Sequence, residues 1–269
     1  MVLFWLDFSA PYILLYGFAM LAASMLVVET ISLGRLAIGL IPAAIVILVL
    51  LKWSLDVIQP SIALVRMVLQ LLMIGFLLAF IFETDHGGIV LLVCAVMILV
   101  AAGIALRTIP STWMDFAAAA LSIVIGGGIP YAISTQLILQ VDPWYEPRVM
   151  VPLAGMVFAN GMNSISLAAE RFESERNQGA ELLHARSTAL KTSLIPITNG
   201  LLAVGLVSIP GMMTGQVLAG VSPFIAARYQ IMVMLMVYGS AGLSSICFLF
   251  WKSRQAGKLV SDSLGSDLG

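Results

Sequence analysis

Long apolar runs joined by short polar connections constrain this chain more than any other feature. A helix needs roughly 20 mostly apolar residues to cross about 30 Å of hydrocarbon. With 61% hydrophobic residues, 10% charged residues and a mean hydropathy of +1.06, the sequence is typical of an integral membrane protein. We therefore predict an all-α, polytopic transmembrane helical bundle of seven or eight spans. The eight qualifying segments are about 12–28, 36–52, 65–82, 88–106, 115–139, 149–169, 194–219 and 226–251.

The placement of lysine and arginine predicts the orientation, because these residues accumulate on the cytoplasmic side. With both termini inside, the inner segments hold ten of them and the outer segments three. The first segment lacks the basic leader and the cleavage site of a secretory signal, so we expect a retained span. The predicted location is the inner (cytoplasmic) membrane. The inner residues are Lys52, Arg66, Arg107, Arg171, Arg176, Arg186, Lys191, Lys252, Arg254 and Lys258, and the outer ones are Arg35, Arg148 and Arg228.

One inner segment, 170–193, stands apart by its charge. It holds eight of the 27 acidic and basic residues of the chain and lacks a continuous apolar stripe. We predict a water-exposed helical hairpin or helix within the single permease domain 1–269, followed at the end of the chain by a cytoplasmic tail, 252–269. The segment is the obvious place to meet a cytoplasmic partner, and a solvated connector without a partner is the alternative. The candidate coupling residues are Glu170, Arg171, Glu173, Arg176, Glu181 and Arg186.

The motifs of catalysis are absent from the sequence. His86 and His184 lie far apart without a HExxH pair, and Cys94 and Cys247 both sit in apolar runs. No GxxxxGK[ST] loop is present, and GGGIP at 126–130 is better explained as a helix break or a close-packing point. The chain is therefore predicted to be no enzyme and to bind no cofactor. A net charge of −1 gives it no basic surface for nucleic acid.

Polar residues within two of the predicted spans mark a candidate translocation path. In the sixth span, Asn160, Asn163 and Ser164 occur at i, i+3 and i+4 and so share a helix face. The seventh span carries prolines and glycines through residues 199–220, and non-helical backbone at membrane depth is tolerated only inside protein or beside a watery cavity. We predict a discontinuous or kinked span that lines a path or packs through small residues. The candidate path residues are Asn160, Asn163, Ser164, Asn199, Ser208, Pro210, Met212, Met213, Thr214 and Gln216.

Three strings carry a family resemblance over about residues 45–250: VRMVLQLLMIGFLLAFIF, DPWYEPRVMVPLAGMVFANGMNSISLAAERF and VGLVSIPGMMTGQVLAGVSPFIAARYQIMVM. The chain resembles the Fet-type iron-export ABC transporter permeases and their plant aluminium-tolerance relatives. The resemblance implies a permease homodimer in the lipid bilayer, a separate cytoplasmic ABC ATPase that binds ATP, and iron export by alternating access. By position, the family signature falls on Asn160, Ser164, Glu170, Arg171, Pro210, Gly211, Met213, Thr214, Gly215, Gln216, Tyr229 and Gln230.

Two departures from that family pattern keep other functions open. The first span is an addition relative to shorter members, and the inner segment lacks the LALGAT-like stretch that relatives usually carry. A secondary transporter driven by an ion gradient is one alternative, although the span centres hold no ionisable residue of the kind that proton relays use. A non-transporting membrane scaffold or regulatory subunit is another. The metal ligands, if any, are not identified by the sequence.

Overall fold

The computed structural model describes residues 31–83 and 86–266, and it is helical throughout apart from turns and one isolated bridge. The predicted first span, 12–28, lies outside the described residues. The all-α prediction is confirmed. The helices are α2 (Leu33–Ile38), α3 (Leu40–Lys52), α4 (Ile58–Phe82), α5 (Gly87–Ala105), α6 (Trp113–Ala132), the π-helical turn η1 (Ile133–Ile138), α7 (Pro147–Asn177), α8 (Leu182–Ala203), α9 (Gly211–Leu218) and α10 (Pro223–Ser266).

Six helices within the described residues are long and apolar enough to cross a membrane. They correspond to the predicted second to sixth spans and to the eighth, so the polytopic membrane bundle is confirmed. The predicted seventh span, 194–219, forms no continuous helix of this kind. The six are Gly34–Lys52, Ile58–Phe82, Gly87–Ala105, Trp113–Ile138, Pro147–Asn177 and Pro223–Gly257.

The chain divides into two compact units, and the first comprises residues 1–76. Its described part is the α2–α3 region and the first part of α4. Just before α4, the side chain of Asp56 accepts a hydrogen bond from the backbone N–H of Ile58 at 2.9 Å, which forms a turn that leads into the helix. This start is seven residues earlier than position 65, where we predicted the span to begin. The difference places Arg66 inside the helix rather than at its end.

The second unit, residues 77–269, is a bundle in which α6 and α10 approach very closely. A Cβ built on Gly126 would lie 2.2 Å from the backbone nitrogen of Ser244, so only glycine permits this contact. One turn earlier on α10, the hydroxyl of Ser240 donates to the carbonyl of Val157 in α7 at 2.8 Å. GGGIP is therefore a close-packing point and not a helix break, since α6 continues through it.

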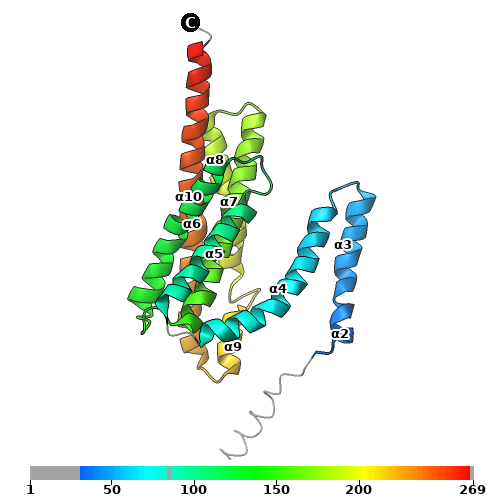
Figure 1. The fold of residues 1–269 in the computed structure, drawn as a ribbon, viewed down its shortest axis with the longest axis vertical. Coiled ribbons are helices and arrows are strands. Elements are labelled where there is room, and N and C mark those ends of the chain that lie inside the picture. The colour runs from blue at the N-terminus through cyan, green and yellow to red at the C-terminus, as the bar shows by residue number, and fades with distance from the viewer. Residues whose placement is uncertain (1–30, 84–85, 267–269) are drawn as a thin grey trace, which may run out of the picture. The chain divides into compact units, whose positions relative to one another are not determined.

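Two helices of this unit are longer than a bilayer requires. At a rise of 1.5 Å per residue, the 31 residues of α7 and the 44 of α10 extend for about 46 and 66 Å. The turn between α7 and α8 and the last part of α10 lie at one end of the bundle, and α9 lies at the other (Figure 1). We call the first of these the hairpin end and the second the break end.

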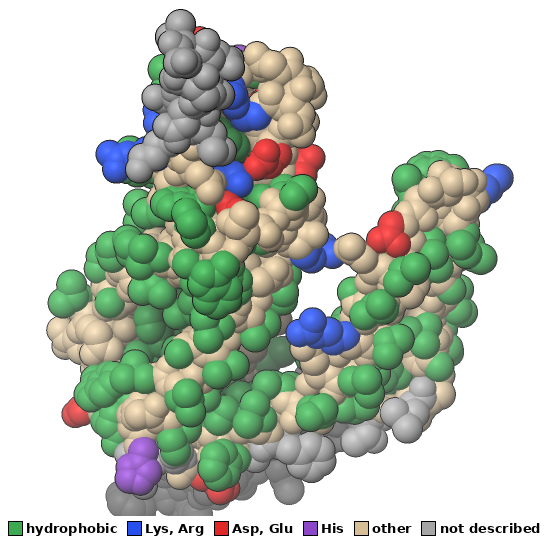
Figure 2. Space-filling view, turned by 45° about the horizontal axis from the view of Figure 1, so that its top comes forward, with side chains coloured by type: hydrophobic (Ala, Val, Ile, Leu, Met, Phe, Trp, Pro, Cys, Tyr) green, Lys and Arg blue, Asp and Glu red, His purple; other side chains and the backbone are tan. Residues whose placement is uncertain are grey.

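At the hairpin end, the charged run 170–193 forms a helix–turn–helix, whereas its exposure to water and its coupling role stay predictions. α7 ends at Asn177, Gly179 turns the chain with a φ of +82°, and α8 begins at Leu182. Phe172 of α7 and Ala185 of α8 are buried against Leu249 of α10. Hydrophobic side chains cover the flank of the bundle, whereas charged ones gather toward this end (Figure 2).

Candidate functional site: the break and the charged hairpin end

The chain leaves helical geometry directly after α8. Val204 is extended, with φ of −63° and ψ of 131°, and Gly205 has a φ of +81° that side-chain-bearing residues rarely adopt. The loop is closed by its own backbone, because Ser208 N–H donates to the carbonyl of Ala203 at 3.1 Å and Gly205 N–H donates to the carbonyl of Ser208 at 2.9 Å. Pro210 then leads into α9. The predicted discontinuity of the seventh span is confirmed.

A half-open pocket of about 500 Å³ lies beside this break. Val204, Pro210 and Met213 line it from the side of the break and α9, and Gln230 and Met234 line it from α10. Its walls are therefore apolar, with two thioethers and one amide. Such a set offers soft sulfur donors and an amide group rather than a carboxylate cage.

Two glutamines near the break have an unpaired side-chain oxygen. Gln230 is 7% exposed, yet its Oε1 has no hydrogen-bond partner, and the same is true of Oε1 of Gln216 in α9. A buried polar atom without a partner costs free energy, so each one calls for an explanation, of which a bound group is one. Within the described part of the chain, no group of three His, Cys, Asp or Glu residues is placed to hold a metal.

The candidate path residues of α7 do not share one environment. Ser164 is buried, and its hydroxyl lies 3.4 Å from the carbonyl of Ser193 and 2.5 Å from the hydroxyl of Ser245. Asn160 is half-buried and donates to the carbonyl of Met156 at 2.8 Å, whereas Asn163 is exposed. Ser164 therefore joins α7, α8 and α10, and only the two asparagines of this set reach the surface of the chain.

The remaining path candidates lie along α8, the break and α9. Asn199, Ser208 and Thr214 are exposed, while Pro210, Met212, Met213 and Gln216 are half-buried. The structure brings Pro210 and Met213 together at the pocket. Their part in a translocation path stays a prediction.

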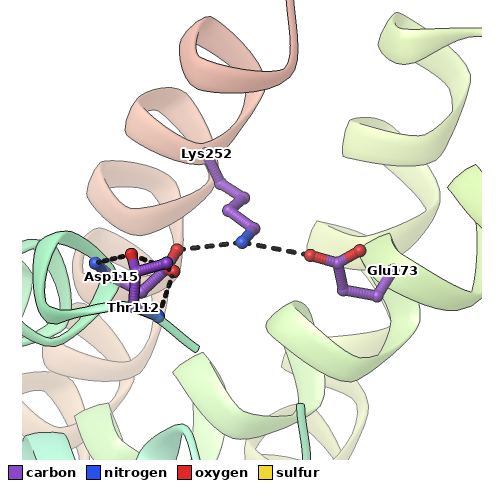
Figure 3. Close-up of polar contacts among 4 residues, drawn as sticks. All are labelled: Thr112, Asp115, Glu173 and Lys252. Carbon is purple, nitrogen blue, oxygen red and sulfur yellow. Dashed lines mark hydrogen bonds and ion pairs between the residues drawn. The ribbon is translucent and has the colours of Figure 1, made fainter. Parts of the chain in front are cut away.

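At the hairpin end, Lys252 of α10 joins two carboxylates from two other helices (Figure 3). Its Nζ lies 2.9 Å from Oδ1 of Asp115 in α6 and 3.0 Å from Oε1 of Glu173 in α7. Asp115 also forms a capping box with Thr112: its Oδ2 accepts from the Thr112 backbone N–H at 2.8 Å, and its own N–H donates to the Thr112 hydroxyl at 3.2 Å. The cluster thus fixes the start of α6 against α7 and α10.

The other coupling candidates lie within the hairpin itself. Arg171 pairs with Glu175 one turn along α7, and Arg176 donates to the carbonyl of Ala180 at 2.7 Å across the turn. Glu170 and Glu181 are exposed, and Arg186 is half-buried. Of the six candidates, Glu173 is the one whose ion pair reaches another helix.

Sequence reasoning missed Asp115 and Lys252 as a site. The pattern Thr112-x-x-Asp115 before an apolar run is the signature of a helix N-terminus and could have placed Asp115. For Lys252, the sequence indicated only a positive charge on the inner side, directly after a long span. The two are separated by 137 positions, and no spacing rule connects them.

Comparison with known proteins agrees with these features. The model of the family described as "Uncharacterised protein family (UPF0014)" matches residues 30–256. A UPF0014 membrane protein of Synechocystis sp. is 38% identical over 67% of this chain and 76% of its own length. The "Probable iron export permease protein FetB" of Escherichia coli is 32% identical over 70% of this chain and 78% of its own.

The chain is also similar to a plant protein. The "Protein ALUMINUM SENSITIVE 3" of Arabidopsis thaliana is 34% identical over 70% of this chain and 74% of its own length. No solved structure matches the chain. The resemblance to the Fet-type permeases and their plant relatives is thereby confirmed, and the chain belongs to the UPF0014 family of multi-pass membrane proteins.

Proposed function

We propose that this chain is the permease subunit of an ABC transporter that exports a metal ion, iron, with the help of a separate cytoplasmic ATPase. The observation that carries the proposal is the break after α8, where a pocket with thioether and amide groups lies next to α10. A similar chain named as a probable iron export permease supports the cargo. The chain itself has no nucleotide-binding loop, so ATP hydrolysis falls to the partner.

α8 gives the proposed transporter a direct mechanical link. Its 22 residues, about 33 Å of helix, begin at the turn of the hairpin and end at the break. A displacement of the hairpin by an ATPase would therefore act on the loop at Val204 and Gly205, which close the pocket on one side. In this proposal α8 transmits the motion and the break absorbs it.

Two exposed amides support a permease dimer around a shared path. Asn163 and Asn199 lie on helices of the bundle, and the described residues provide neither with a side-chain hydrogen bond. Placing a bare amide in hydrocarbon costs about 4–8 kcal/mol, so lipid is a poor neighbour for both. In the proposed inner-membrane homodimer, these amides face the second copy or the water between the copies.

The experiment is reconstitution with a separate cytoplasmic ABC ATPase, sought first in the reading frames that neighbour the gene of this chain. The tagged permease is purified together with that ATPase and placed in liposomes. ATP and Fe²⁺ are added outside, so that outward-facing ATPases drive Fe²⁺ into the lumen, and ATP turnover and metal flux are measured. We expect ATP-dependent flux that falls when Met213 is replaced by Leu, while Met114→Leu at the exposed start of α6 serves as the matched control.

Three other results separate the rival functions. Flux without ATP under a proton gradient would identify a secondary transporter. An ATPase that binds without any flux would favour a scaffold or regulatory subunit. Unchanged flux and turnover after replacing 173–189 by a Gly/Ser linker would contradict the coupling role of the hairpin.

A further inference from the structure

The two ion pairs of Lys252 lie in very different surroundings. The side chain of Asp115 is 3% exposed and also bonds to Thr112, so this pair is enclosed. The side chain of Glu173 is 30% exposed, and among the described residues its pair with Lys252 is the only ion pair or hydrogen bond it makes. Figure 3 shows the ammonium between the two carboxylates, with the capping box on one side only.

This asymmetry decides which pair can open. Separating Lys252 from Asp115 would leave a buried carboxylate without its cation, which is strongly unfavourable. Separating it from Glu173 would release a carboxylate that water already reaches, and such partly exposed pairs contribute little. The pair with Glu173 is therefore the one that a modest force can break and re-form.

The packing around the cluster has the same asymmetry. α6 and α10 are fixed to each other where Gly126 meets the backbone of Ser244. The hairpin meets α10 at this end through apolar side chains, among them Phe172 and Leu249. Apolar contacts have no directional preference, so they permit a small slide that a charge pair resists.

We propose that Lys252 and Glu173 form a latch that holds the α7–α8 hairpin against the α6–α10 pair and that opens at Glu173 while Asp115 retains the ammonium. The inference rests on the proposed function for its purpose, because the hairpin is the element that an ATPase would move. Both residues are positioning residues: neither touches the pocket at the break. The latch sets how readily the hairpin moves, and so how tightly ATP turnover and transport are linked.

The test uses the full permease in lipid nanodiscs, without the ATPase, and follows hydrogen exchange of the backbone. In Glu173→Gln we expect exchange at residues 170–177 to become about fivefold faster, with the start of α6 at 113–117 and the melting temperature unchanged. Lys252→Arg should keep the protection of both segments. Glu170→Gln, an exposed carboxylate on the same helix without an ion pair in the described residues, is the matched control.

Two results overturn the latch. One is unchanged exchange at 170–177 in Glu173→Gln, and the other is an equal increase at 113–117, which would mean that the cluster opens as one body. In the reconstituted complex, Glu173→Gln should raise ATP turnover per exported ion at least about twofold. A wild-type complex that exports nothing while the exchange pattern holds would remove the proposed function and leave the latch standing.

Discussion

The Lys252 cluster at the hairpin end and the two glutamines at the break end satisfy their polar groups in opposite ways. At the hairpin end, Lys252 has two carboxylates and Asp115 has a capping box. At the break end, Gln230 beside the apolar pocket and Gln216 in α9 each have a buried oxygen without a partner. A network in which every polar group has a partner opposes opening, whereas an acceptor without a partner can take a hydrogen bond from a ligand. The comparison indicates that the Lys252 cluster holds three helices together, whereas binding of the cargo at the break end belongs to the proposed function.

The largest loss of stability is expected at the contact between α6 and α10, the two helices that connect the hairpin end with the break end. Gly126→Ala places a Cβ 2.2 Å from the backbone nitrogen of Ser244, and no rotamer can relieve a Cβ contact. We expect α6 and α10 to separate and more than ~4 kcal/mol of stability to be lost. Aggregation or loss of the monodisperse peak in size-exclusion profiles in detergent would reveal the loss of folding. Gly128→Ala, with no neighbour within 4 Å, should behave as wild type, and equal behaviour of the two variants would refute the packing argument.

The next effect tests the closed network at the hairpin end. Asp115→Asn leaves Lys252 facing one carboxylate and weakens the capping box with Thr112. We expect a loss of about 2–3 kcal/mol, seen as a melting temperature lower by roughly 5–10 °C. Glu173→Gln should change it by less than about 2 °C, because that pair is more exposed. Similar losses in both variants would contradict the distinction between the two pairs.

At the break end, removal of a buried polar group should leave stability equal or raise it. Gln230→Met removes a buried oxygen that has no partner and keeps the volume of the side chain. We expect the free energy of unfolding to stay equal or rise by up to ~1–2 kcal/mol. Metal flux in the reconstituted complex should fall at least about tenfold, or ~1.4 kcal/mol. A clear loss of stability would show that the amide is structural.

The smallest effect concerns the conformation of the break itself. Gly205→Ala introduces a side chain at a φ of +81°, with open space around it, so the cost is backbone strain alone. We expect about 1 kcal/mol of destabilisation. Gly215→Ala within α9 is the matched control and should stabilise by up to ~1 kcal/mol, since alanine favours helix. Thermal melts of both variants decide whether the break is a defined turn.

Much of this architecture could be predicted because it depends on local chemistry. Pro210 and the glycines around it predict a break, and the charged run 170–193 predicts a hairpin outside the hydrocarbon. The cluster at Lys252 could not be predicted in the same way. It depends on the register at which α6, α7 and α10 pass one another, and that register follows from contacts such as Gly126 on Ser244 that connect distant parts of the chain.

Faces were harder to predict than helices. The spacing of Asn160, Asn163 and Ser164 placed all three on one side of α7, but it could not say which neighbours that side would meet. Ser164 turned out to contact Ser193 and Ser245 in two other helices. Likewise, α10 continues to Ser266 through residues whose charge had suggested only a tail. Helical periodicity predicts which face of a helix a side chain lies on, but it does not predict which neighbouring helix that face contacts.

The contact of Gly126 with Ser244 has a geometric consequence for α10. Ser244 stands 21 residues after Pro223 and 22 before Ser266, so about 32 Å of helix extends on one side of it and 33 Å on the other. If this contact acts as a fulcrum, α10 is a balanced lever. The pocket wall at Gln230 and Met234 lies only about 15–21 Å from the contact, so a small tilt displaces it roughly half as far as the tip at Ser266, and in the opposite direction.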